Sequence, residues 1–402
     1  MATLQKTTGV IAKSICKQIS DHIGATWSDS PAQWWSNIFN NAQTINSFFT
    51  ELVNVIIEQR IKADSFENPL NRYKSGELPL GLGDTVIYFN PQTGRDFTTK
   101  PDDMQNHIVN WKDNNAARNR NYGIFLDVLP DVKQVFFRLN FGKQYKLTYS
   151  DIELNNVMTT WNSVGEFIDA ISRNLTASAN IEEYQAMRDL FANGYEQGFI
   201  PIQPISEITD QATGDAFLVQ ARKYYNQFKF PSENYTGWNA KNPEAKVKTW
   251  TNPEKISIVL TPQTSAVVDV MSLSKAFNMD KADMIGRTQI VDTLDENGKV
   301  AAILFDDALL HVRPKVEQFG AFFNPDTIKQ SIYLTRTGIM ALDPFANAVA
   351  FTTDTFTALA EQPDDWATDY TNYYVKVGTT YTRLGEYSEA PEFAAGTYYE
   401  KD

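Results

Sequence analysis

The sequence has almost no cysteine and very little histidine. Cys16 is the only cysteine, so one chain can form neither an internal disulfide nor a cysteine-based zinc site, and a reducing compartment is expected. The histidines are His22, His107 and His311, and none has a second histidine at metal-ligand spacing. No stretch approaches the roughly eighteen apolar residues of a membrane span, and residues 1–20 lack the apolar core of a signal peptide. Neither secretion nor membrane insertion is expected.

Motifs that mark common enzyme sites are absent as well. The chain has no GxxxxGK[ST] phosphate loop, no GxSxG turn, no HExxH helix and no GxGxxG fingerprint. Asp306, Asp307 and His311 form the one suggestive cluster, because two carboxylates and an imidazole could bind a metal or share a proton. Within LFDDALLHV, a turn after a strand followed by a half-exposed histidine explains them better. We therefore predict no catalytic, cofactor or metal site and no enzyme activity.

What is present is the composition of an ordinary folded protein. The 402 residues are 42% hydrophobic, 13% aromatic and 21% charged, which is enough for two or three domains. The 36 lysine and arginine residues against 49 aspartate and glutamate residues leave a net charge of −13. A protein whose main task is to bind nucleic acid carries the opposite balance. The acidic balance argues against that class.

A helical pattern near the N-terminus carries a large apolar surface. After a polar opening, Ser30 and Pro31 are typical of an N-cap and a first helical position. Further on, seven apolar residues follow a helical period along one face: Ile45, Phe48, Phe49, Leu52, Val53, Ile56 and Ile57. With Trp34 and Trp35 ahead of it, this face needs a receiving surface. That surface can belong to the same chain or to a neighbour, and both alternatives stay open.

A long excursion with short strand patterns follows. Residues 85–89 and 132–149 are the strand candidates, the second interrupted near Asn140. Residues 60–150 contain 13 basic and 10 acidic residues, so the segment is slightly basic within an acidic chain. Because such long loops are usually functional, we interpret it as an arm that reaches a partner protein. A nucleic-acid patch or a solvated face could also explain its basic residues Arg118, Arg120, Lys133, Arg138, Lys143 and Lys146.

The remainder of the chain alternates helices and strands. Helices are predicted at residues 164–175, 181–197, 216–228 and 267–277, with Gly198 as the stop of the second. Strand candidates are residues 255–261, 288–292, 300–305, 308–312, 331–337 and 346–352. The fold class is therefore mixed, with helices and strands interleaved.

The last part of the chain differs in composition. Residues 361–402 contain nine aromatic, nine acidic and three basic residues. A tyrosine-rich hairpin is predicted around Gly378. The segment is too short for an immunoglobulin-like sandwich, which takes about 100 residues.

Four stretches resemble the major capsid proteins of small podophages that replicate by protein priming. They are residues 68–81 (NPLNRYKSGELPLG), 164–198 with GEFIDAI and EEYQAMRDLFANGY, 272–286 (SLSKAFNMDKADMIG) and 344–351 (PFANAVAF). The stretches occur in family order and span most of residues 60–353, and SKAFNM and FANAVAF are the most specific pair. The resemblance implies a mixed α+β subunit with the Hong Kong 97 type of capsid fold.

The resemblance also implies a division of the chain. Its parts are an N-terminal arm (1–66), an extended E-loop (67–150), a peripheral domain (151–204 and 311–356) with a spine helix at 181–197, an axial domain (205–310) and an acidic C-terminal segment (357–402). Some relatives carry an immunoglobulin-like domain where this chain has residues 361–402. A surface ornament, a shell-locking strap and a contact to the host surface are all open roles. Deleting 361–402 is expected to leave particle formation intact.

The function that the resemblance implies is that of a major capsid protein. Such a subunit self-assembles through hexamers and pentamers into the icosahedral head shell around phage dsDNA. The implied partners are other copies, a scaffolding protein, a portal protein and dsDNA bound without sequence specificity, with no cofactor and no membrane. Assembly is expected in the host bacterial cytoplasm, and the mature location is the virion.

Two other function classes are kept beside this one. The first is a minor virion or tail protein whose C-terminal segment binds the host surface, and the second is an enzyme that uses Asp306, Asp307 and His311. For the capsid interpretation, we expect the helix near the N-terminus and the basic arm to contact neighbouring subunits. The expected contact residues are Phe48, Phe49, Leu52, Ile56, Arg118, Arg120 and Arg138.

Overall fold

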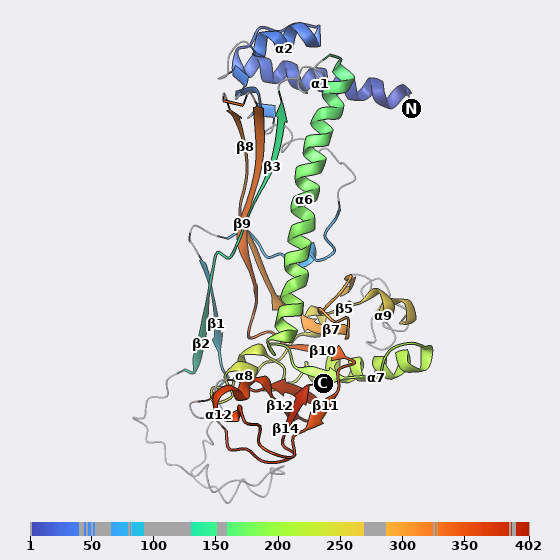
Figure 1. Cartoon of the computed structure of the whole chain (residues 1–402), viewed down its shortest axis with the longest axis vertical. Helices are drawn as coiled ribbons and strands as arrows, with labels where there is room; N and C mark the ends of the chain where they lie inside the picture. The colour runs from blue at the N-terminus through green and yellow to red at the C-terminus, as the bar shows by residue number, and fades with distance from the viewer. Residues whose placement is uncertain are drawn as a thin grey trace, which may run out of the picture. The chain divides into compact units, whose positions relative to one another are not determined.

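The computed structural model (Figure 1) divides into two compact units, Met1–Asp84 with Phe137–Asp402, and Thr85–Phe136. The residues that it describes are 2–39, 44, 45, 47–49, 51, 52, 66–78, 81, 83–91, 130–150, 159–268, 287–324, 326, 327, 329–385, 387 and 391–401. The helices are α1 (Ala2–Ile23), α2 (Pro31–Phe39), α6 (Trp161–Glu196), α7 (Gln211–Gln227), α8 (Gly237–Lys241), α9 (Pro262–Val267) and α12 (Trp366–Asp369). Within these described residues, no helix combines the length and apolar character that a bilayer span needs.

The described strands form a two-stranded ribbon, a three-stranded sheet and a nine-stranded sheet. In the ribbon and the three-stranded sheet they are β1 (Gly83–Phe89), β2 (Val132–Arg138), β3 (Phe141–Ser150), β8 (Leu310–Asn324) and β9 (Lys329–Leu342). The strands of the nine-stranded sheet are β4 (Ile202–Pro204), β5 (Ile256–Leu260), β6 (Thr288–Ile290), β7 (Val300–Asp306), β10 (Ala348–Thr352), β11 (Phe356–Ala358), β12 (Tyr374–Val377), β13 (Thr380–Arg383) and β14 (Tyr398–Lys401).

The centre of the nine-stranded sheet is covered on both faces. Its strand order is β11-β14-β12-β13-β4-β10-β7-β5-β6, and every residue of β5 and β10 is buried. Successive side chains of a strand point to opposite faces. Accordingly, Ile303 and Phe305 pack with the C-terminal half of α6, whereas Ala302 and Leu304 pack with α7. The continuous apolar run of a strand such as ISIVL follows from this burial on two sides.

The helix α6 runs beside the three-stranded sheet β3-β9-β8 (Figure 1). Thr160 caps its first turn, because the Thr160 hydroxyl accepts from the Ser163 backbone N–H at 3.2 Å. Gly198, with φ of +69°, follows its C-terminal end in the left-handed conformation that glycine favours. The long hairpin β8–β9 pairs from Leu310 with Leu342 out to Asn324 with Lys329.

The N-terminal helices form a separate apolar cluster with the first half of α6. α1 crosses the N-terminal part of α6 (Figure 1), and Trp34 of α2 donates its indole N–H to Ser20 at 2.6 Å. Ile332 and Leu334 of β9 close the same cluster from the sheet side. The cluster is therefore built from segments at the start, the middle and the end of the chain.

The second unit contains most of the β1–β2 ribbon. Asn90 follows β1 and Asp131 precedes β2, and the Asn90 backbone N–H donates to the Asp131 carbonyl at 2.9 Å. The Asn90 side chain also donates to the Asp131 carboxylate at 2.9 Å. The end of one strand thus lies beside the start of the other, so the two strands run antiparallel.

Several predicted elements are confirmed. α2 begins at Pro31, β5 covers most of the predicted buried strand, and α7 covers most of the predicted helix at 216–228. The strand candidate at 132–149 is divided into β2 and β3 next to Asn140. The C-terminal hairpin turns at Gly378, whose φ is +65°.

One helix was not predicted and other predictions were wrong. The polar opening, for which no element was predicted, contains the helix α1, whose buried residues Ala12, Ile15, Cys16 and Ile19 follow a helical period. The helices predicted at 164–175 and 181–197 are one helix, because residues 176–180 contain neither glycine nor proline to end it. α9 ends at Val267, where a helix was predicted to begin, and residues 269–286 lie outside the described part of the chain.

Candidate assembly surfaces

The apolar helical segment near the N-terminus is buried inside its own chain. Phe48, Phe49 and Leu52 are all 0% exposed. The Trp34 and Trp35 rings meet the Phe48 ring edge-on, with centroids 5.4 and 5.7 Å apart. Packing of this segment against the core of its own chain therefore explains why its described apolar side chains are buried. Contact of these side chains with a neighbouring subunit stays a prediction, and the expected contact residue Ile56 lies outside the described residues.

The β1–β2 ribbon exposes large apolar side chains. The exposed fractions are 51% for Ile87, 66% for Phe89, 40% for Val132 and 55% for Phe136. Because the spacing within each strand is an even number, each pair lies on one face of its strand. A two-stranded ribbon alone is at best marginally stable in water. An apolar face on such a ribbon is typical of a surface that another chain completes.

The arginines of the predicted basic arm are only partly described. Arg138 is exposed at the end of β2, and no ion pair to it occurs among the residues with described positions. Arg118 and Arg120 lie outside the described residues. Lys133 in the same ribbon forms an ion pair with Asp131 at 2.9 Å. Part of the candidate basic patch is therefore used inside the ribbon itself.

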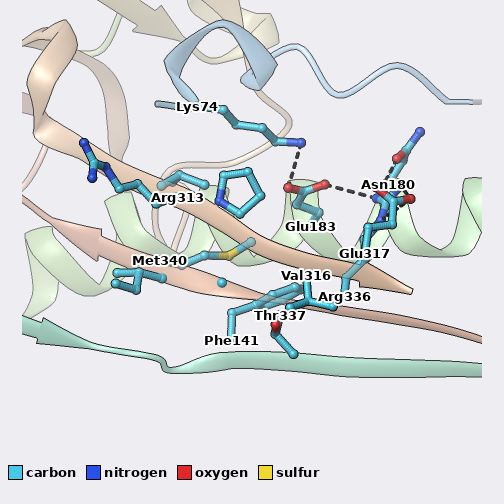
Figure 2. A pocket seen from close by; sticks show the side chains of 14 residues that line it. Lys74, Phe141, Asn180, Glu183, Arg313, Val316, Glu317, Arg336, Thr337 and Met340 are labelled. Carbon is cyan, nitrogen blue, oxygen red and sulfur yellow. Dashed lines mark hydrogen bonds and ion pairs between the residues drawn. The ribbon is translucent and has the colours of Figure 1, made fainter. Parts of the chain in front are cut away.

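A largely buried ion network joins three distant segments (Figure 2). Glu183 of α6 is 7% exposed and pairs with Lys74 at 2.7 Å and with Arg336 at 3.3 Å. Arg336 of β9 also pairs with Glu317 of β8 at 3.0 Å and donates to the Asn180 side-chain oxygen at 3.0 Å. One set of charges therefore holds the long helix, the β8–β9 hairpin and the segment before β1.

A cavity of about 180 Å³ lies beside this network (Figure 2). Its lining combines the charged residues with apolar side chains from β3, β8 and β9. Here β8 shifts register between Pro314 and Val316. Gly338 lies opposite, and a Cβ at this position would come within 2.6 Å of the Arg313 carbonyl oxygen. Close backbone approach at the bulge therefore requires glycine.

The segment before β1 follows β8 through backbone hydrogen bonds. Ser75 N–H donates to the Val312 carbonyl at 2.9 Å, and Leu78 N–H donates to the Pro314 carbonyl at 2.9 Å. The bridge between Lys74 and Val312 is parallel. The point from which the long excursion departs is thus fixed to the body of the chain.

The acidic and histidine cluster suggested by the sequence does not converge. Asp306 accepts from a backbone N–H two residues on, and Asp307 accepts from a serine hydroxyl of β5. His311 points to Asp84, with its Nε2 atom 3.0 Å from a carboxylate oxygen, and stacks on Phe137. Burial lowers the pKa of His311, and the Asp84 carboxylate only partly opposes this, so the imidazole is neutral near pH 7. In the described part of the chain, no three histidine, cysteine or acidic side chains are grouped to hold a metal.

The C-terminal segment is built into the nine-stranded sheet. β13 pairs with β4 through Tyr381, and β14 lies between β11 and β12. Arg383 donates to the carbonyl of Glu196, the last residue of α6, at 2.9 Å. Lys401 of β14 pairs with the buried carboxylate of Asp354 at 3.2 Å. Lys401 also lies 3.9 Å from the Glu196 carboxylate, so the segment fastens the last described strand to the end of the long helix.

Sequence reasoning missed the ion network. Glu183 lies four residues before the buried Met187, so it occupies the apolar face of α6. A carboxylate on an apolar helical face signals a buried partner, because an unpaired buried charge is costly. The identity of its partners, Lys74 and Arg336, depends on contacts across more than one hundred residues, which the local pattern does not contain.

Comparisons with known proteins agree with this architecture. The family model of Phi29-like phage major capsid proteins matches residues 11–352. The chain is 26% identical over 326 residues to the major capsid protein of Bacillus phage PZA, which covers 81% of this chain and 67% of the relative. It is also 26% identical over 321 residues to the major capsid protein of Streptococcus phage Cp-1, covering 75% of this chain and 81% of the relative.

Solved capsid structures share the fold. A chain of the Staphylococcus phage Andhra capsid superposes with a TM-score of 0.53 at 12% identity, covering 72% of this chain and 85% of the other. A chain of the native bacteriophage P68 structure gives a TM-score of 0.51 at 11% identity, with coverages of 73% and 86%. The expected mixed α/β fold of the Hong Kong 97 type is thereby confirmed. The chain belongs to the Phi29-like phage major capsid protein family and is a structural subunit of the phage head shell, not an enzyme.

Proposed function

We propose that this shell subunit assembles through pentamers and hexamers in which segment 67–150 lies over a neighbouring subunit. The observation that carries the proposal is the exposed apolar face of the β1–β2 ribbon, above all Phe89 and Phe136. Burial of apolar surface stabilises association by about 25 cal/mol per Å² before the costs of ordering are counted. Modest contacts of this kind accumulate when they repeat around a closed ring.

The roles of the chain's parts follow the same proposal. Residues 1–66 act as the N-terminal arm, 67–150 as the E-loop, 151–204 with 311–356 as the peripheral domain, and 205–310 as the axial domain. Arg138, with Arg118 and Arg120, meets acidic surface of the adjacent subunit, since the chain carries a net charge of −13. A scaffolding protein, a portal protein and dsDNA packaged without sequence specificity are the further partners.

The ribbon contact is tested by making its exposed face polar. We expect Phe89→Ser with Phe136→Ser to leave a folded subunit that no longer forms particles, because neither ring is packed inside the chain. Circular dichroism checks folding and electron microscopy counts particles. Ile290→Ser, which alters a 51% exposed side chain of β6, is the matched control and is expected to assemble. Normal particle yield from the double variant would refute the ribbon contact.

The charge contact has its own test. Reversal of Arg118, Arg120 and Arg138 to glutamate places like charges opposite an acidic neighbour, which costs association energy. We expect particle yield to fall, and to fall less when the three residues are replaced by lysine. Unchanged assembly of the glutamate variant would exclude these arginines from the interface while leaving the ribbon contact in place.

A further inference from the structure

Two aromatic side chains lie exposed on adjoining segments that follow α7 and precede β5. Phe230 is 68% exposed and Trp250 is 48% exposed. Ser232 and Thr249 exchange two backbone hydrogen bonds of 2.9 Å, so these segments run beside each other. Large aromatic side chains are enriched at protein interfaces relative to the rest of the surface.

Lysine residues lie close to both aromatic residues along the chain. Lys229 adjoins Phe230, with its ammonium group 4.2 Å from the centroid of the Tyr225 ring, and Lys246 and Lys248 are exposed just before Trp250. Residues 222–255 contain seven lysine and arginine residues against three glutamates, in a chain that is acidic overall. We call the surface made by Lys229, Phe230, Lys246, Lys248 and Trp250 the basic aromatic surface.

The C-terminal segment carries the complementary charge. Residues 361–402 contain nine acidic residues against three basic ones. Glu361, Asp364, Asp369 and Glu400 are exposed, while the fold of the segment is held by the buried Trp366 and the tyrosines around it. The match to the family model ends at residue 352, so this acidic surface is an addition to the shared capsid body.

We propose that the basic aromatic surface of one subunit binds the acidic C-terminal segment of a second copy in the shell. Opposite charge brings the two surfaces together and fixes their register, and Phe230 and Trp250 supply apolar area to bury. A contact between two different surfaces of the same chain repeats around a ring. This contact is additional to the ribbon contact and uses a segment that the shared family region lacks.

A second copy fits the surface better than packaged DNA does. Duplex DNA presents a phosphate backbone, which lysines bind, whereas aromatic rings gain from stacking on unpaired bases. The C-terminal segment offers carboxylates to the lysines and the partly exposed Tyr398 and Tyr399 to the rings.

Two complementary charge-reversed chains test the proposal. Variant A carries Lys229→Glu, Lys246→Glu and Lys248→Glu, and variant B carries Glu361→Lys, Asp364→Lys and Glu400→Lys. Each alone places like charges at the contact, so we expect its particle yield to fall about tenfold or more at low salt. Co-expression of A and B restores opposite charges at every contact between an A copy and a B copy, so it should recover a substantial part of the yield, although a ring of five keeps at least one like-charge contact. The control is variant A with arginine in place of glutamate, which keeps the charge and should assemble.

Three results would overturn the proposal. Normal assembly of A and B separately would show that the charges are not at an interface. If particle yield recovers in a single chain that carries all six changes but does not recover in the mixture of A and B, the contact lies within one chain. Normal shells from A that retain less DNA would identify a nucleic-acid surface instead. Each of these results leaves the subunit's role in the shell intact, because wild-type particles are measured alongside.

Discussion

At the scale of single residues, Glu183 is the side chain on which three distant segments depend. Its carboxylate is largely buried and balances two cations, Lys74 and Arg336, that keep 24% and 16% of their side chains exposed. Removing one partner of a buried ion pair leaves the remaining charge buried without compensation. The resulting loss of stability is larger than the net stability that the intact pair contributes. The residue therefore matters for stability more than its single charge suggests.

We expect Glu183→Gln to lower the free energy of unfolding by roughly 2–3 kcal/mol, below the range for fully buried pairs because both cations reach solvent. Urea unfolding followed by tryptophan fluorescence measures the change. Glu317→Gln removes a 54% exposed partner of the same arginine and should cost less than about 1 kcal/mol. Equal costs for the two variants would show that burial of Glu183 is not what makes the network important.

Asp343 gives the chain a pH-dependent stability. Burial raises its pKa to about 6, with a further contribution from the Asp306 carboxylate, while the Phe345 backbone N–H opposes the shift. As the pH rises, the Asp343 carboxyl of the unfolded chain loses its proton at a pKa of about 3.9, whereas the folded state keeps this proton up to a higher pH. The associated stability is present below pH 4 and is lost as the pH rises to 6.

We expect Asp343→Asn to stabilise the protein by about 1–2 kcal/mol at pH 8 and to have little effect near pH 4. The Asn side chain keeps the acceptor for Phe345 without the charge. Thermal unfolding across this pH range measures the difference, with the exposed Asp215→Asn as the control. A variant that is destabilised at pH 8 would contradict burial of an ionised carboxylate at this position.

At the scale of elements, the β8–β9 hairpin contains two glycines with different surroundings. A Cβ at Gly338 would meet the Arg313 backbone at the bulge of β8, whereas a Cβ at Gly320 has no neighbour within 4 Å. We expect Gly338→Ala to destabilise the chain by roughly 1–3 kcal/mol, because backbone cannot move aside as a flexible side chain can. Gly320→Ala should be neutral in the same unfolding measurement. A neutral Gly338→Ala would mean that the bulge is free to shift.

Local patterns predicted those elements whose signals are local. The proline at the start of α2, the apolar run of β5 and the glycine turn at Gly378 need no distant partner to be recognised. The length of β8 and β9 was not predicted, since their alternation is broken by Pro314 and by exposed residues such as Phe322. These strands are long because each supports the other in register, which is a tertiary property.

At the scale of the whole molecule, the C-terminal segment is more than an appendage. β13 covers the edge of β4, and Tyr374 and Tyr381 belong to the central apolar cluster. Truncation after residue 360 would therefore open a sheet edge and expose apolar surface. We expect the truncated chain to aggregate, in contrast to the expectation from sequence that particles still form without this segment.

Centrifugation and circular dichroism of the truncated chain check this expectation. A full-length chain with Glu361→Gln and Glu392→Gln keeps the fold of the segment and serves as the control, because both side chains are exposed. A truncated chain that stays folded and assembles would show that β4 tolerates an open edge. The segment's place in the sheet escaped sequence reasoning, because a tyrosine-rich hairpin does not reveal which edge it joins.

Formation of a shell is the central claim, and imaging of assembly tests it most directly. The chain is expressed alone and with a phage scaffolding protein, and both samples are studied by negative-stain electron microscopy and light scattering. Closed shells or rings of hexamer size are the predicted result, because the exposed ribbon and the charged surfaces leave contacts for neighbours to complete. A well-folded chain that stays monomeric even with the scaffolding protein present would contradict the account.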